Sequence, residues 1–144
     1  MSVFMLAIGL FLFGLGEALL VASGAGVSPW TVFAQGFSKV TDWSIGFSTF
    51  TISFFVLLLW IPLRQKPGVG TILNIIIISF VLDLSAPYLP VFDTPALQIA
   101  EAALGVVITG IGGGIYLIAN LGPGPRDGLM TGVQRKTSLP LATV

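Results

Sequence analysis

Long apolar stretches, separated by short polar or glycine- and proline-rich segments, dominate the chain. A helix needs about 20 residues to cross a bilayer, and the pattern predicts four transmembrane helices, over residues 3–24, 45–62, 69–84 and 96–121. The third is short for a span, so we expect it either to continue toward Tyr88 or to thin the bilayer locally. A short helix is predicted over 29–37, because Ser28 and Pro29 suit an N-cap and the first helical position.

Two tryptophans, Trp43 and Trp60, bracket the second predicted span. An α-helix rises ~1.5 Å per residue, so their indoles would lie about 25 Å apart along it. Tryptophan is enriched where a membrane meets water. We therefore expect both side chains at the two membrane surfaces.

The chain also contains an internal repeat at an offset of 96 residues. Six residues are identical between the copies: Gly14 and Gly110, Gly16 and Gly112, Gly26 and Gly122, Pro29 and Pro125, Gly36 and Gly132, Thr41 and Thr137. In each copy an apolar helix runs into a Gly-x-x-Pro loop. Three spans separate the copies, so the second would enter the membrane upside down, as in the inverted repeats of many secondary transporters.

The repeat predicts how the chain is divided. We expect a first repeat over 1–95 and a second, incomplete one over 96–144, with a fifth helix beginning near Leu141 after a Gly/Pro loop. A full plan of three plus three helices would need six, so the chain is expected to be a truncated form of a six-helix parent. The fold class is an all-α, polytopic transmembrane helix bundle.

Small residues four apart predict where the repeats touch. Gly14 and Ala18 lie on one face of the first span, and the repeat maps them onto Gly110 and Gly114 of the fourth. Such stripes let membrane helices approach closely. We predict that the first and fourth spans cross at these four residues.

The composition indicates that a lipid bilayer surrounds most of the chain, and it excludes several functions. Of 144 residues, 55% are hydrophobic and only 8% are charged, against about 25% charged in soluble domains. Six acidic and six basic residues cancel, which disfavours a nucleic-acid partner. The chain has no cysteine or histidine, so thiol chemistry, the usual zinc and haem sites and His-assisted nucleophiles are excluded. We expect no enzyme activity, no metal and no cofactor.

Basic residues predict the orientation. The loops 25–44 and 85–95 share one membrane side and contain Lys39 as their only basic residue. The opposite side holds five: Arg64, Lys66, Arg126, Arg135 and Lys136. Because cytoplasmic loops are enriched in Lys and Arg, we expect a plasma-membrane protein with a cytoplasmic N-terminus.

Glu17 is an ionisable residue inside the first predicted span. A carboxylate at membrane depth costs roughly 2.5–3.5 kcal/mol on insertion scales, so it must face protein or water. It is either a proton-linked or cation-binding group, or a protonated or hydrogen-bonded residue within the packing.

The second Gly-x-x-Pro loop contains adjacent Arg126 and Asp127. In one interpretation, backbone N–H groups at a helix N-terminus and Arg126 bind an anion, with Asp127 orienting the guanidinium. In the other, the loop is a rigid helix breaker, and Arg126 sets topology and pairs locally with Asp127. Neither a P-loop nor a dinucleotide-binding glycine motif occurs.

Three segments, 26–30, 60–74 and 122–132, resemble the YczE/YitT-type family of bacterial integral membrane proteins, and the likeness covers nearly the whole chain. The resemblance implies about six helices but no established substrate or catalytic residue. The family's first copy usually reads Ser-Pro-Trp-Asp. Here Thr31 stands in place of that aspartate, and Glu17 stands where an apolar residue is more usual.

These features favour a transporter or permease for an unknown small solute. The candidate substrate- or ion-binding residues are Glu17, Ser28, Pro29, Trp30, Arg126 and Asp127. The alternative is a non-transporting accessory, regulatory or scaffold protein. Beyond the lipid bilayer, its partner would then be a second copy or another membrane protein.

Overall fold

The computed structural model describes residues 2–138 and 140, and every regular element in this part of the chain is helical. Its elements are α1 (Ser2–Ser23), α2 (Pro29–Thr41), α3 (Ile45–Leu63), α4 (Val69–Ser85), the short 3-10 helix η1 (Ala86–Tyr88), α5 (Pro95–Ala119) and α6 (Pro125–Thr137). Four of these segments are long and apolar enough to cross a membrane: Val3–Ser23, Ile45–Leu63, Val69–Tyr88 and Pro95–Ala119. The four predicted spans are confirmed, including the extension of the third to Tyr88.

Helix α6 occupies a segment that the sequence predicted as loop. Gly124 is its N-cap in extended conformation, Pro125 takes the first helical position, and Ser138 ends it in the left-handed region. This is the start and stop chemistry of an ordinary helix. The fifth span that the repeat predicts near Leu141 lies outside the described residues.

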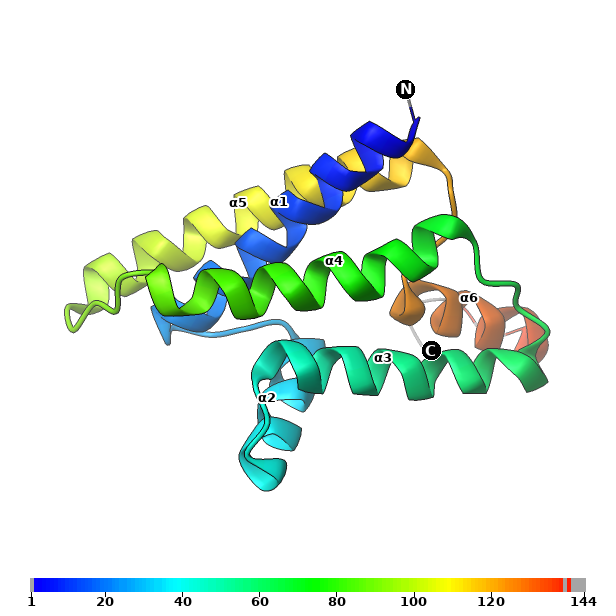
Figure 1. The fold of residues 1–144 in the computed structure, drawn as a ribbon, viewed down its shortest axis with the longest axis horizontal. Helices are drawn as coiled ribbons and strands as arrows, with labels where there is room; N and C mark the ends of the chain where they lie inside the picture. Colours follow the sequence, from blue (N-terminus) through cyan, green and yellow to red (C-terminus); the bar gives the residue numbers. More distant parts are fainter. Residues whose placement is uncertain (1, 139, 141–144) are drawn as a thin grey trace.

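Helices α1 and α5 pack along each other, and α4 packs against both α1 and α3 (Figure 1). The predicted contact between the first and fourth spans is therefore confirmed. It is closest at glycines: a Cβ atom on Gly9 or Gly16 of α1 would press on the backbone of α5, and one on Gly105 or Gly112 would press on the backbone of α1. Small residues let the two backbones approach, as they do in other membrane helix pairs.

The residues predicted to make this crossing are corrected by the structure. A Cβ atom on Gly110 or Gly114 would meet nothing within 4 Å, so neither glycine permits close packing. Gly14 faces Val81 of α4 instead of α5, whereas Ala18 is fully buried. The glycines at the contact recur at seven-residue spacing, which keeps them on the shared face of two helices that cross at a shallow angle.

Helix α3 supports both short helices. Figure 1 shows α2 beside the N-terminal end of α3 and α6 beside its C-terminal end. A cluster of apolar side chains joins the three helices: Ala34, Ile52, Val56 and Trp60 form its buried part, and Leu129 packs against it. Both short helices thus pack against α3.

Trp60 is a core residue, which corrects its predicted place at the membrane surface. Its side chain is 1% exposed, and its Nε1 donates a 3.1 Å hydrogen bond to the carbonyl of Pro125. A Cβ atom on Gly128 would overlap the indole ring, so a glycine is needed where α6 lies on Trp60. Trp43, by contrast, is exposed.

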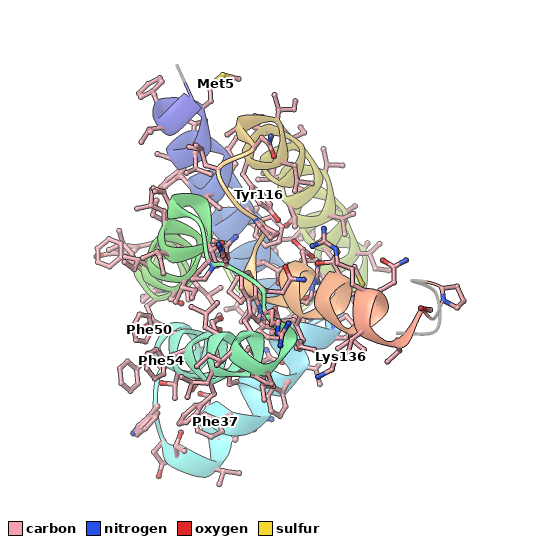
Figure 2. The ribbon with its side chains drawn as sticks, turned by 90° about the vertical axis from the view of Figure 1, so that its right-hand side faces the viewer. Met5, Phe37, Phe50, Phe54, Tyr116 and Lys136 are labelled. Carbon is pink, nitrogen blue, oxygen red and sulfur yellow. The ribbon has the colours of Figure 1, made fainter. Side chains whose placement is uncertain are left out.

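Many large apolar side chains point away from the bundle. Figure 2 shows Phe50 and Phe54 projecting outward from α3, while Tyr116 lies among the helices. This distribution is expected of a bundle whose outer surface contacts lipid rather than water.

Candidate functional site

The segments that flank α2 and α6 have positive φ angles at three corresponding positions. Both helices contain 13 residues and begin at a proline. Positive φ angles recur at corresponding positions, at Gly24 and Asn120 (64° and 50°), Gly26 and Gly122 (151° and 125°), and Asp42 and Ser138 (56° and 56°). Positive φ is uncommon outside glycine, and Asn120, Asp42 and Ser138 adopt it.

The starts of the two short helices meet at one cavity of about 60 Å³. Ser28, Trp30 and Thr31 line it from α2, and Gly124, Pro125, Arg126 and Asp127 line it from α6. Side chains of α1, α3, α4 and α5 complete the wall: Phe13, Glu17, Thr49, Ser53, Asn74, Ile75, Ile78, Ser79, Leu82 and Tyr116. A cavity needs about 10–15 Å³ measured in this way to hold one water, so this one has room for a few waters or a small polar group.

On the α2 side, Glu17 of α1 binds the first turn of the short helix. Thr31 Oγ1 donates a 2.5 Å hydrogen bond to Glu17 Oε2, and Ser28 Oγ donates a longer one of 3.2 Å to the same oxygen. Ser28 Oγ also accepts from the backbone N–H of Thr31, which makes Ser28 the N-cap. The carboxyl group of Glu17 is thus held at the N-terminus of a helix, where negative charge is stabilised.

On the α6 side, the carboxylate belongs to the short helix itself. Tyr116 of α5 donates a 2.6 Å hydrogen bond from its hydroxyl to Asp127 Oδ2. The other oxygen of Asp127 faces Arg126, whose Nε lies 3.4 Å away. The Arg126 side chain is more than half exposed, and bonds of this length are weak, so the guanidinium is only loosely attached.

The two sides therefore use the same kind of bond with the roles exchanged. At the third helical position, α2 has the hydroxyl of Thr31 and α6 has the carboxylate of Asp127. The long helix supplies the complementary group each time, Glu17 from α1 and Tyr116 from α5. Each hydrogen bond ties the start of a short helix to the span that precedes it.

Five of the six candidate binding residues line the cavity: Glu17, Ser28, Trp30, Arg126 and Asp127. Pro29 does not line it, because it occupies the exposed outer side of the first turn of α2. Arg126 is exposed and paired with Asp127. This geometry is compatible with both interpretations of the second Gly-x-x-Pro loop.

Sequence reasoning missed the polar residues that the long helices contribute: Thr49, Ser53, Asn74, Ser79 and Tyr116. Thr49 and Ser53 lie four apart on α3, so they share one face. Asn74 and Ser79 interrupt the isoleucine-rich run of α4. Polar residues on an otherwise apolar span were a usable signal for the first four, whereas nothing in the sequence singles out Tyr116.

A wider groove of about 570 Å³ reaches the same place from between α1, α5 and the 25–28 loop. Four residues line both the groove and the cavity: Phe13, Glu17, Ser28 and Arg126. Glu17 thus lies where the two spaces meet. Within the described residues, no group of three or more acidic side chains could hold a metal ion.

The fold and this site define a class of protein: a helical membrane protein in which two short helices start at a cavity inside a bundle of spans. The chain belongs to the family DUF6198, described as a family of unknown function, whose model matches residues 1–144. The resemblance to YczE-type membrane proteins is thereby confirmed.

Two relatives show how far the similarity extends. An uncharacterized protein of Haemophilus influenzae is 38% identical over 143 residues, which are 99% of this chain and 66% of the relative. The uncharacterized membrane protein YczE of Bacillus subtilis is 34% identical over 135 residues, 90% of this chain and 61% of the relative. The chain thus spans less than two thirds of each relative's length. No solved structure matches it.

Proposed function

We propose that this protein is a permease for a small solute, which it binds in the cavity at the starts of α2 and α6. The observation that carries the proposal is the convergence of two helix N-termini on one cavity, lined by both polar and apolar side chains, beside the middle of α4. Secondary transporters commonly bind their substrates near the bilayer midplane, at the ends of short or broken helices. The proposal involves no enzymatic step.

Inverted symmetry between residues 1–95 and 96–144 is part of this proposal. The matched φ angles of the two loops and the equal lengths of α2 and α6 support it. So does the placement of α2 and α6 at opposite ends of α3 (Figure 1). Such symmetry would let the cavity open toward either side by a similar movement of either half.

We place the N-terminus in the cytoplasm and the protein in the plasma membrane, as the distribution of Lys and Arg indicates. A reporter that is active only in the cytoplasm should then be active when fused after Lys136 and silent when fused after Val91. The reverse pattern would overturn the orientation.

One observation leaves room for the accessory function. Only 17% of the apolar stretch of α5 is buried, against 50% in α1. Its exposed side chains include Val106, Val107, Ile111 and Ile118, which would contact either lipid or another membrane protein. Solute transport and a partner on this face are compatible, so the transport assay decides between a permease and a scaffold.

The test compares the small-molecule content of cells that express the chain or its variants. Mass spectrometry of the extracts should show at least one solute raised or lowered severalfold by the wild type. Arg126→Lys and Asp127→Asn should reduce the effect, because lysine lacks the planar fork of arginine and asparagine lacks the charge. Arg135→Lys, an exposed arginine on the same helix, is the matched control. If cells with the wild type and cells that lack the protein have the same small-molecule content, the accessory function is favoured.

A further inference from the structure

We propose that the cavity beside Glu17 binds a small monovalent cation. This inference names the occupant of the site described above and rests on the proposed function. It concerns the inner cavity, where Glu17 contributes a carboxylate whose charge the surrounding side chains do not match.

No basic side chain pairs with Glu17 among the described residues, and the ion pair they form joins Arg126 to Asp127. Glu17 is nonetheless 94% buried, with 6% of its surface exposed. Its Oε2 atom accepts the hydrogen bonds from Ser28 and Thr31. Within the described residues, the hydrogen bonds to this carboxyl group reach Oε2 and none reaches Oε1. One carboxylate oxygen is therefore open to a ligand.

The charges around the cavity are unevenly matched. Its ionisable lining consists of two carboxylates, Glu17 and Asp127, and one guanidinium, Arg126, which pairs with Asp127 beside the N-terminus of α6. Glu17 has only the N-terminus of α2, whose partial charge of roughly +0.5 offsets about half of its charge. An isolated charge is costly inside a membrane, so a bound cation would complete the site.

The remaining wall offers oxygen atoms. Ser79 is among the residues that line the cavity, and its Oγ atom is buried without a hydrogen-bond partner in the described residues. Ser53 and Thr49 add hydroxyl groups to the same wall. A buried polar atom without a partner is destabilising, and a cation with its last water molecules would supply that partner. Oxygen donors with one free carboxylate suit a singly charged ion, because divalent cations usually take more carboxylates.

The volume is sufficient for a small cation. About 60 Å³ accommodates an alkali ion with water or a small protonated amine. The groove of about 570 Å³ offers the route. Glu17, Ser28 and Arg126 line both spaces, so a cation that leaves the groove passes the carboxylate of Glu17 and the guanidinium that is paired with Asp127.

The experiment measures thermal unfolding of the purified full chain in detergent at constant ionic strength. The bulky cation N-methyl-D-glucamine is replaced by Li⁺, Na⁺, K⁺ or methylammonium, all as chlorides. At least one should raise the melting temperature by about 3 °C or more at saturation, since a ligand of the folded state stabilises it. A response to alkali ions alone identifies an inorganic ion, and a response to methylammonium alone identifies an amine.

Glu17→Gln should abolish the shift, and Glu101→Gln should keep it. Glu101 is the matched control because it is equally buried within a span but lines neither space. If Glu17→Gln does not fold, Ser79→Ala should raise the half-saturating cation concentration severalfold. Equal stability in all salts, or an unchanged shift in Glu17→Gln or Ser79→Ala, would overturn the inference. If a cation raises the melting temperature but no solute moves, only the permease is rejected. If a solute moves but no cation raises the melting temperature, only the cation site is rejected.

Discussion

Thr31 Oγ1 donates a 2.5 Å hydrogen bond to the carboxyl group of Glu17, which reaches it from the preceding span. The corresponding position on α6 is Asp127, which accepts a hydrogen bond from Tyr116. A carboxyl group therefore lies at the start of each short helix, although it comes from a different element each time. The two unusual features that the family resemblance indicated, Thr31 and Glu17, are in contact with each other.

This contact predicts that the carboxylate can be moved from α1 to α2. Glu17→Leu leaves buried hydroxyls without their acceptor and should cost about 1–3 kcal/mol of folding free energy. Thr31→Asp should also destabilise, because it places two carboxyl groups together. The double variant Glu17→Leu/Thr31→Asp should recover most of the loss, measured by thermal unfolding. If the two losses simply add, the carboxylates are not interchangeable.

Tyr116→Phe tests the equivalent bond on α6. The substitution removes the hydroxyl that donates to Asp127 and should lower the unfolding free energy by about 1–2 kcal/mol. Tyr88→Phe serves as the control, because Tyr88 is 83% exposed and its loss should be neutral. Equal melting temperatures for both variants would mean that the bond to Asp127 does not hold α6 in place.

Gly112 and Gly114 provide a matched pair for the contact between α1 and α5. Alanine at 112 would overlap the backbone of α1 at Phe13, and overpacking of this kind costs about 1–3 kcal/mol. Alanine at 114 meets open space and should be neutral or stabilising by up to ~1 kcal/mol, since alanine favours helix. Folded yield after purification measures the difference. Equal tolerance at both positions would exclude a close crossing at Gly112.

The sequence was sufficient for the spans, because twenty consecutive apolar residues have few alternatives to a membrane helix. It did not show which face of each helix packs against its neighbour. Gly110 and Gly114 fit a four-residue stripe as well as Gly105 and Gly112 fit a seven-residue one, and only the crossing angle distinguishes them. Trp60 was misplaced for a related reason: tryptophan at the end of a span suits both an interface and a buried contact.

The sequence predicted the loop residues of the candidate site better than the residues that the spans contribute to it. Glu17, Ser28 and Asp127 were identifiable because charged or capping residues stand out in an apolar chain. Polar residues of the spans such as Ser79 were visible in the sequence, but nothing in it singles out Tyr116. No local pattern encodes which residues of distant helices face one cavity, so their grouping required the tertiary structure.

The central claim is that this cavity opens to both sides of the membrane, and the absence of native cysteine permits a direct test. Ser79→Cys places a thiol in the cavity wall, and Ser48→Cys places one at a buried serine outside it. Each variant is reconstituted in sealed vesicles and treated with a membrane-impermeant thiol reagent applied to one side at a time. The account predicts labelling of Ser79→Cys from both sides and of Ser48→Cys from neither. Labelling of Ser79→Cys from one side only, or from neither, would contradict a permease.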